Sequence, residues 1–254
     1  MTINPIGICG TAGLASAIAV RMAASGIRVI VHGFAPEATV SGRKTRIERA
    51  ANLFDLASEC EAVIAVYDTH QALRDALTGS QDRPGLLGAM VPGAVVADLS
   101  GGTPDETRRL AGQLAGRAIG LVELAEIGGA AAINTGDARI YAGGFGEHVE
   151  RLTPALACLG SVKRIGPQGS ARTYVALSEA VRAAYQVALE EAQMIAAAGG
   201  FVPEELATPP LSHEENAQLA AHLAGALAQS QGAPAPLLTA LAALLAQPGG
   251  LKRP

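Results

Sequence analysis

A glycine-containing turn near the start of the chain holds the residue types that bind phosphate. Gly10, Ala12 and Ala15 occupy the three positions that are glycine in the dinucleotide-binding pattern Gly-x-Gly-x-x-Gly. A turn of this kind at the start of a helix offers free backbone N–H groups and the positive end of the helix dipole to an anion. The alternative interpretation is a tight strand-to-helix turn without a ligand. We predict a pyrophosphate site formed by Gly10, Thr11, Ala12, Gly13 and Leu14.

The segment around this turn has the pattern of a strand, a helix and a second strand. Residues 6–9 are apolar, residues 14–24 show helical periodicity and end at Gly26, and residues 27–31 are rich in β-branched side chains. This order is that of a βαβ unit, which places the turn at the end of a buried strand and at the start of a helix. The predicted ligand is therefore a dinucleotide.

Strand and helix patterns alternate as far as residue 166. Apolar strand patterns recur at residues 61–67, 93–100, 121–129, 138–144 and 161–166. Helical patterns occur in the second half of residues 32–61, at residues 70–77, after the capping residue Thr103, and at residues 147–159. We therefore predict an α/β fold in which residues 1–166 form a Rossmann-type, doubly wound parallel sheet. Residues 171–198 predict one long interdomain helix, within an all-helical domain at residues 167–254.

Composition restricts the classes of partner. The 254 residues carry a formal net charge of −4, aromatic residues make up 3% of the chain, and there is no tryptophan. Such a chain is not expected to bind nucleic acid or an anionic membrane surface. No apolar run is long enough and free enough of glycine and proline to span a membrane, and the three cysteines lack metal-site spacing. We expect a cytoplasmic protein with a small-molecule substrate and no metal.

Five segments follow one another in an order that is typical of a known family. They are IGICGTAGLASAIA, GLLGAMVPGAVVADLSGGTPDETRRLA, INTGDARIYAGG, IGPQGSARTYVALSEA and NAQLAAHLAGALAQSQGAPAPLLTAL. These segments resemble the glycine loop, the PGxxVVDxS stretch, the strand ending in Gly-Gly, the start of the interdomain helix and a late helix pair of one family. That family is the β-hydroxyacid dehydrogenase and imine reductase branch of the 6-phosphogluconate dehydrogenase superfamily. The resemblance covers nearly the whole chain and implies an NAD(P)-dependent oxidoreductase.

The resemblance also implies which positions would carry the reaction. Hydroxyacid dehydrogenases of this family have a lysine on the interdomain helix and an asparagine four residues later, where this chain has Val175 and Glu179. The serine before the family's Gly-Gly loop is replaced by Ile127. Because valine cannot move a proton, standard oxidation of a 3-hydroxyacid is not expected. Reduction of an imine or iminium group fits these residues better, and the SGGTP segment is also closest to imine reductases.

Two residues are the candidate catalytic groups. Tyr174 matches a tyrosine that is common in imine reductases, although a tyrosine on a packed helix is also a frequent core residue. Glu179 lies on the same helix face as Val175 and could hold a cationic amine or act as a general acid. Its alternative is a solvated glutamate paired with Arg182. Glu123 and Glu126 lie around the turn that precedes Gly128, the first residue of the Gly-Gly loop, and we expect these three residues to face the substrate.

The residues that usually distinguish NADP from NAD are replaced in this sequence. Relatives that prefer NADP have an Asn-Arg-Thr run after the second strand, where this chain has Gly33, Phe34 and Ala35. An acidic residue for the ribose of NAD is also absent from these positions. A basic cluster, Arg43, Lys44 and Arg46, could reach a phosphate or could be a solvated patch. We predict NADP or NAD, with NADP slightly preferred, bound by the glycine turn and by Phe34, Tyr67, Asp68 and Ser100, with His32 as a weaker candidate for a ribose contact.

The resemblance further implies a homodimer formed through the helical domain. The family usually has extra helices over the active site, and only the segment FVPEELATPPLSHEE stands at that point here, so the predicted helical domain is shortened. The leading prediction is hydride transfer to a C=N or C=O group of a small molecule. One alternative is a 3-hydroxyacid-type dehydrogenase with a rewritten active site. The other is a non-catalytic protein that uses nucleotide binding for sensing or assembly.

Overall fold

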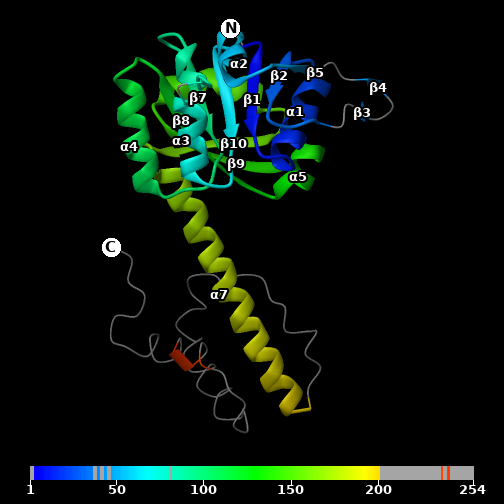
Figure 1. The fold of residues 1–254 in the computed structure, drawn as a ribbon. Helices are drawn as coiled ribbons and strands as arrows, with labels where there is room; N and C mark the ends of the chain where they lie inside the picture. The colour runs from blue at the N-terminus through cyan, green and yellow to red at the C-terminus, as the bar shows by residue number, and fades with distance from the viewer. Residues whose placement is uncertain are drawn as a thin grey trace. The chain divides into compact units, whose positions relative to one another are not determined.

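An eight-stranded sheet forms the centre of the N-terminal part of the protein. The computed structural model describes residues 3–36, 39–40, 43–44, 47–80, 82–200, 236 and 239–240. The strands follow the order β10-β9-β8-β7-β6-β1-β2-β5 across the sheet (Figure 1). Their bounds are β1 Ile6–Gly10, β2 Val29–His32, β5 Ile47–Arg49, β6 Ala62–Val66, β7 Val95–Asp98, β8 Gly120–Ile127, β9 Ala138–Gly144 and β10 Gly160–Gly166.

Neighbouring strands run parallel from β5 to β8 and again between β9 and β10, whereas β9 runs antiparallel to β8. The antiparallel step differs from the predicted all-parallel sheet. It arises because a short helix, α5 (Gly129–Thr135), turns the chain back directly after β8. No separate signal in the sequence marks this helix, since its seven residues begin with a run of glycine and alanine. The parallel majority of the sheet confirms the predicted α/β class.

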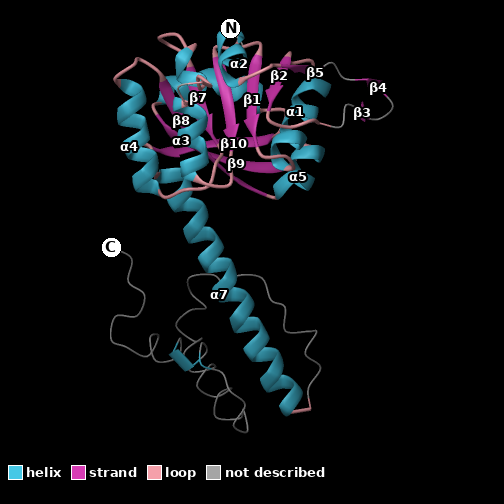
Figure 2. Cartoon of the chain, in the orientation of Figure 1, coloured by secondary structure: helices cyan, strands magenta, loops and turns pink. Residues whose placement is uncertain are grey.

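Helices cover both faces of the sheet, as Figure 2 shows. Helices α1 (Leu14–Ala24), α5 and α6 (Gly146–Leu156) pack on one face through residues such as Ile18, Ile133 and Leu156. The other face is covered by α2 (Leu53–Glu59), α3 (His70–Thr78) and α4 (Pro104–Ala115), through Leu56, Leu73 and Leu110. Both faces of the strands are buried, which explains why their sequences are continuous apolar runs. The two faces together confirm the doubly wound arrangement.

Helical periodicity and capping residues in the sequence predicted the bounds of several helices correctly. The bounds of α1 agree with the predicted residues 14–24. Thr103 caps α4 as predicted, because its Oγ1 accepts from Glu106 N (3.3 Å) and Glu106 Oε2 accepts from Thr103 N (2.8 Å). The long helix α7 covers Ser170–Ala198, against the predicted 171–198. In the part of the chain that the structure describes, no helix is long and apolar enough to cross a membrane.

The segment after β2 differs from its prediction. Its second half was expected to be helical throughout, but the structure has strand β5 and then α2, with a two-stranded hairpin of β3 (Thr39–Val40) and β4 (Arg43–Lys44) before them. Strand β5 is too short to show a period and is held by pairing with β2. Asn52 then caps α2, because its Oδ1 accepts from Asp55 N at 2.8 Å. The helical prediction for residues 47–49 was therefore wrong.

The chain divides into two compact units, Met1–Ala176 and Leu177–Pro254. The division lies within α7, ten residues beyond the end of β10 at Gly166, where the boundary between 166 and 167 was predicted. Of residues 201–254, only 236 and 239–240 are described. These three residues are helical and belong to the predicted late helix pair, whereas the rest of that pair and the shortened connection before it lie outside the described residues.

Candidate functional site

The glycine turn lies at the carboxyl end of β1, and its backbone is fixed by the neighbouring strand. Thr11 N donates to Val66 O at 2.8 Å. Gly10 has a φ of +137°, and a Cβ at this position would collide with the carbonyl oxygen of Val66. Gly13 has a φ of +84°, with open space around the position of a Cβ. The turn thus needs glycine at position 10, and it exposes Thr11, Ala12 and Gly13.

The N-terminus of α1 is open to an anion. No described side chain caps this helix, and its first turn contains no acidic residue. By contrast, α2, α3 and α4 are capped by Asn52, Thr69 and Thr103. Uncapped N–H groups and the dipole of an 11-residue helix suit a pyrophosphate, and the exposed glycine turn leaves room for it. The residues present therefore fit a dinucleotide.

The end of β2 lies next to this turn. A Cβ at Gly33 would come within 3.1 Å of Gly10 O, so the two backbones approach closely. His32 Nδ1 lies 3.2 Å from Ala50 O. Phe34 is only 9% exposed and packs in the core, and it also lines the surface pocket here. That pocket has a volume of about 410 Å³ and includes His32, Gly33 and Ala35 in its lining.

Ser100 ties the ends of β6 and β7 together. Its Oγ accepts from Tyr67 N (3.1 Å) and lies 3.3 Å from Ala65 O, to which it donates. Asp68 Oδ2 accepts from Thr11 Oγ1 at 3.4 Å, so the end of β6 also contacts the glycine turn. Burial raises the pKa of Tyr67, and its contact with Cys9 raises it further. The structure thus brings Tyr67, Asp68 and Ser100 to the same sheet edge as Gly10 and Thr11.

A buried arginine connects this edge to α7, and the sequence reasoning did not single it out. Arg172 Nη2 donates to Asp98 Oδ2 at 2.6 Å, and its Nη1 donates to the carbonyl oxygens of Ser100 and Gly102. The Arg172 side chain is 9% exposed and the Asp98 side chain is fully buried. Burial raises the pKa of Asp98, while the Arg172 charge and the hydrogen bonds from Ser100 and Arg172 oppose that rise. The guanidinium therefore holds the loop after β7 against the start of α7.

Glu123 caps α7. Its Oε2 accepts from Gly169 N (2.7 Å) and Ala171 N (3.3 Å), and its Oε1 accepts from Arg172 N (3.0 Å). Oε1 also lies 3.3 Å from Arg172 Nε, an ion-pair distance without hydrogen-bond alignment. The carboxylate is fully buried, and its lone pairs are occupied by this helix start. The expected substrate contact of Glu123 stays a prediction, whereas the geometry gives it the task of positioning α7.

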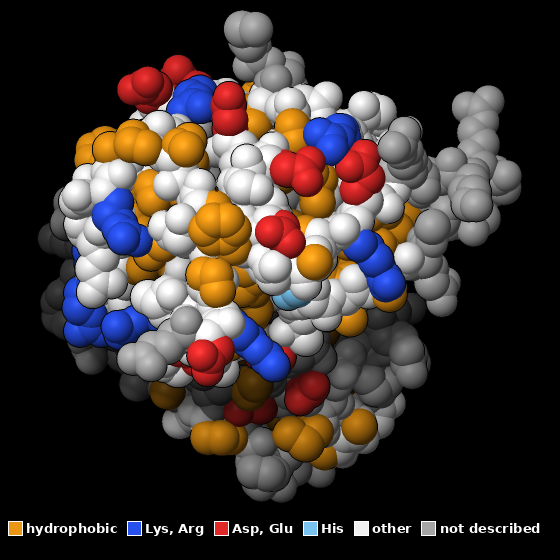
Figure 3. Space-filling model, turned by 45° about the horizontal axis from the view of Figure 1, so that its top comes forward, with side chains coloured by type: hydrophobic (Ala, Val, Ile, Leu, Met, Phe, Trp, Pro, Cys, Tyr) orange, Lys and Arg blue, Asp and Glu red, His pale blue; other side chains and the backbone are white. Residues whose placement is uncertain are grey.

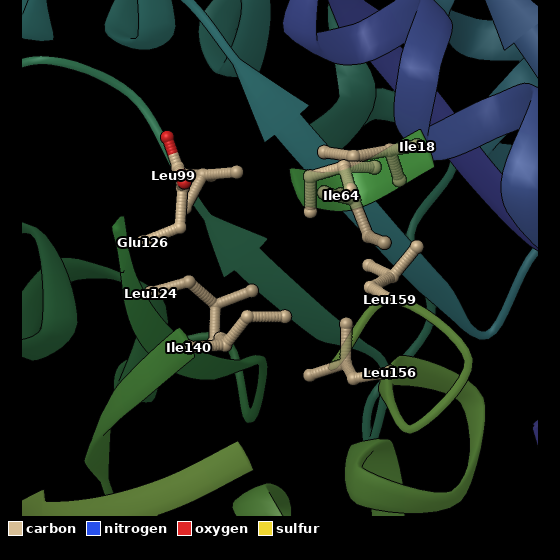
Figure 4. Close-up of a pocket in the computed structure, with 9 residues that line it drawn as sticks. Ile18, Ile64, Leu99, Leu124, Glu126, Ile140, Leu156 and Leu159 are labelled. Carbon is tan, nitrogen blue, oxygen red and sulfur yellow. The ribbon is translucent and has the colours of Figure 1, made fainter. Parts of the chain in front are cut away.

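Glu126 lies on the opposite face of β8 from Glu123, because successive residues of a strand point to alternate faces. Its Oε2 accepts from Gly129 N at 2.9 Å, at the start of α5. It also borders a cavity of about 10 Å³ whose other lining residues are apolar, Ile18, Ile64, Leu99, Leu124, Ile133, Ile140, Leu156 and Leu159 (Figure 4). This cavity holds no more than a water molecule. Gly128 is exposed, with a φ of +122°. The substrate contacts of Glu126 and Gly128 stay predictions.

Tyr174 pairs with a second tyrosine from the sheet. The rings of Tyr141, on β9, and Tyr174, on α7, lie with centroids 4.5 Å apart at an angle of 48°. Tyr174 is 39% exposed. Desolvation raises the pKa of Tyr141, and the hydrogen bond with Tyr174 adds to that rise. Two phenol side chains thus stand together at the start of α7, where Val175 follows Tyr174, and Tyr141 was not among the candidates chosen from the sequence.

Some of the predicted residues fall outside what can be described. The side chains of Glu179 and Arg182 lie outside the described part of α7, although the backbone there is helical. The side chains of Arg43 and Lys44 and the whole of Arg46 also lie outside it. Among the residues that the structure describes, no group of three His, Cys, Asp or Glu side chains is arranged to hold a metal ion.

Comparison with known proteins identifies a family that matches in sequence and solved structures that share the fold. Residues 5–175 match the family model of the NAD-binding domain of 6-phosphogluconate dehydrogenase. In sequence, the chain is 28% identical over 197 residues to an Arabidopsis thaliana protein named probable 3-hydroxyisobutyrate dehydrogenase-like 3, mitochondrial. The match covers 77% of this chain and 61% of that relative, so the chain spans less than two thirds of the relative's length.

Two solved structures share the fold. A 3-hydroxyisobutyrate dehydrogenase from Mycobacterium tuberculosis, determined with L-serine, has a TM-score of 0.73 at 18% identity, over 97% of this chain and 93% of that one. An imine reductase from Aspergillus terreus, determined with NADPH4, has a TM-score of 0.72 at 20% identity, over 96% and 93% of the two chains. At these identities the likeness concerns the fold.

Proposed function

The chain belongs to the family of the NAD-binding domain of 6-phosphogluconate dehydrogenase, in its β-hydroxyacid dehydrogenase and imine reductase branch, and from that premise we propose a function. The protein is an NAD(P)-dependent oxidoreductase that transfers hydride to a C=N or C=O carbon of a small molecule. The observation that carries this proposal is the start of α1, which no described side chain caps. It lies beside Gly10, where only glycine fits against Val66 O, and at the same sheet edge as Ser100. It is a ready site for a dinucleotide.

In this proposal the turn residues bind the pyrophosphate through their backbone N–H groups. The N–H groups at the start of α1 face the anion, and Gly13 leaves the approach open. The loop held by Ser100 and Arg172 lies at the ends of β6 and β7, where the nicotinamide half is expected in an open α/β sheet. The bound nicotinamide supplies the hydride. The protein's own residues orient the reactants and provide the proton.

Imine reduction is favoured over hydroxyacid oxidation by the residues at the start of α7. Val175 cannot accept or donate a proton, whereas a neutral phenol can donate one. The Tyr174 hydroxyl, hydrogen-bonded to Tyr141, is therefore the proposed proton donor to the imine nitrogen. An iminium substrate needs no proton and instead needs a nearby negative charge, which is the role proposed for Glu179. In the described residues, Asp98 and Glu123 are occupied by Arg172 and by the start of α7, so neither is free to take over these tasks.

The test measures the rate at which the protein reduces a panel of cyclic imines, monitored through the loss of NADPH absorbance. We expect Tyr174→Phe to lower kcat about 100-fold, because a general acid contributes a factor of this size or more. The dissociation constant of this variant for NADPH should not change, since the Tyr174 ring packs on Tyr141 of β9, and three strands separate β9 from β1. Tyr141→Phe should lower kcat less than Tyr174→Phe does, because it removes the hydrogen-bond partner of the proton donor and leaves the donor itself in place. Unchanged kcat in Tyr174→Phe and Glu179→Gln would remove the proposed donor and anchor.

The same proposal includes a homodimer in the cytoplasm. Its support is the exposure of large apolar side chains along α7, with Leu177 62% and Val181 70% exposed. Such side chains in one row commonly mark an interface. Light scattering on the purified protein measures the association. A monomer at micromolar concentration would contradict it.

A further inference from the structure

We propose that Arg49, at the end of β5, binds the 2′-phosphate of NADP and makes the protein selective for that cofactor. The inference rests on the proposed dinucleotide site, and it concerns a residue that neither the motif pattern nor the family resemblance singles out. In dinucleotide sites the adenosine ribose lies at the end of the second strand of the βαβ unit. A carboxylate there binds the free hydroxyl of NAD, and an arginine accommodates the phosphate of NADP.

The pairing of β5 with β2 brings Arg49 to this position. The register aligns Val31 with Arg49, and Ala50 N donates to Val31 O at 3.0 Å. Arg49 and His32 both line the pocket of about 410 Å³ at the end of β2. Since the end of β2 also approaches Gly10 closely, one dinucleotide can reach the glycine turn and this pocket.

The charge of Arg49 is available to a ligand. Its side chain is exposed, and it forms no ion pair or hydrogen bond with another residue in the described ranges. The preceding residue, Glu48, points to the other side of the strand, where it pairs with Arg28 at 2.7 Å. Arg49 therefore lines the pocket, and no described carboxylate pairs with it. A guanidinium can form forked hydrogen bonds with a phosphate.

The rest of the pocket favours a phosphate over a free ribose hydroxyl. The residues that follow β2 are Gly33, Phe34 and Ala35, and none of them is acidic. Phe34 packs in the core, and Gly33 and Ala35 line this side of the pocket beside it. A dianionic 2′-phosphate meets a cation here, whereas Gly33, Phe34 and Ala35 offer no carboxylate to the hydroxyl of NAD. Arg49 thus replaces, from another strand, the arginine that other dinucleotide sites carry directly after β2.

Calorimetric titration of the full chain with NADPH and with NADH tests this assignment. We expect wild-type protein to bind NADPH more tightly than NADH. Arg49→Gln should weaken NADPH binding about tenfold to a hundredfold, the size of one charged hydrogen-bonded contact, and leave NADH binding within about twofold. Arg49→Lys should retain part of the preference, because it keeps the charge but loses the fork. The effect of Arg49→Gln should also shrink at high salt.

The matched control is a variant with Arg43, Lys44 and Arg46 all changed to Gln, which removes the neighbouring basic cluster. We expect this variant to keep the preference for NADPH. The proposal is overturned if the control loses that preference while Arg49→Gln keeps it, or if Arg49→Gln weakens both cofactors equally. Failure of the wild-type protein to bind either cofactor would instead refute the proposed function. Because Arg49 is exposed, Arg49→Gln should fold normally, which its melting temperature checks.

Discussion

At the scale of single residues, Arg172 connects more of the candidate site than any residue chosen from the sequence. It joins Asp98 on β7, Glu123 on β8 and the carbonyl of Ser100, which lie far from it along the chain. Asp98 lies 74 positions and Glu123 lies 49 positions from Arg172 along the chain. Patterns among residues close together in the sequence do not predict contacts over such separations. The available signal was the presence of Asp98 and Glu123 in two mainly apolar strands, since a buried carboxylate needs a partner.

Removal of this guanidinium should destabilise the protein strongly. Arg172→Met leaves the buried Asp98 and Glu123 carboxylates without their cation, which costs about 3–5 kcal/mol of the free energy of unfolding. Adding Asp98→Asn to Arg172→Met should cost less than the sum of the two single changes, because the pair acts as a unit. Urea unfolding measures both effects.

A matched control is available on α4. Arg108 also pairs with an aspartate, Asp105, but the two side chains are 55% and 78% exposed. Arg108→Met should therefore change stability little, because solvent screens an exposed pair. Equal losses in Arg172→Met and Arg108→Met, or additive losses in the Asp98 double variant, would contradict the account of this cluster.

At the scale of elements, the sequence predicted those whose signals are local. The helices α1, α4 and α7 have clear periodicity, and α4 also has its Thr103 cap and Pro104 at the first position. Strand β5 was not predicted, because three residues show no period and their pairing with β2 is long-range. That strand carries Arg49, so the residue that we propose to select the cofactor came only from the fold. The glycine turn was predicted because its function depends on the spacing of adjacent residues.

The glycine turn gives an element-scale prediction. Gly10→Ala should weaken NADPH binding more than tenfold, because a Cβ collides with Val66 O and displaces the turn from the start of α1. Fluorescence titration with NADPH measures this loss.

Gly26→Ala, at the other end of α1, is the control for strain alone. Gly26 has a φ of +86°, and no atom lies within 4 Å of the position of its Cβ. Alanine there is strained but collides with nothing, so it should lower the melting temperature and leave NADPH binding intact. If both variants bind NADPH like the wild-type protein, the turn is not the pyrophosphate site.

At the scale of the whole molecule, one face of the described part of the chain carries charges of both signs (Figure 3). On the face shown in Figure 3, acidic and basic side chains are interspersed with apolar ones, and neither sign forms a continuous patch. The N-terminal unit, Met1–Ala176, contains the sheet, the glycine turn, the Arg172 cluster and the tyrosine pair. All groups proposed to hold the cofactor and to donate the proton therefore belong to one compact unit. Glu179 and the proposed dimer contacts of α7 belong to the other.

Direct binding of the cofactor tests the central claim most directly, because every proposed step depends on it. Calorimetric titration of the wild-type chain with NADPH should show saturable binding of one molecule per chain, with a dissociation constant at or below about 1 mM. Binding should also raise the melting temperature as the NADPH concentration rises above that constant, because a ligand of the native state stabilises it. Absence of both the heat and the shift in melting temperature, with NADPH and with NADH, would contradict the account.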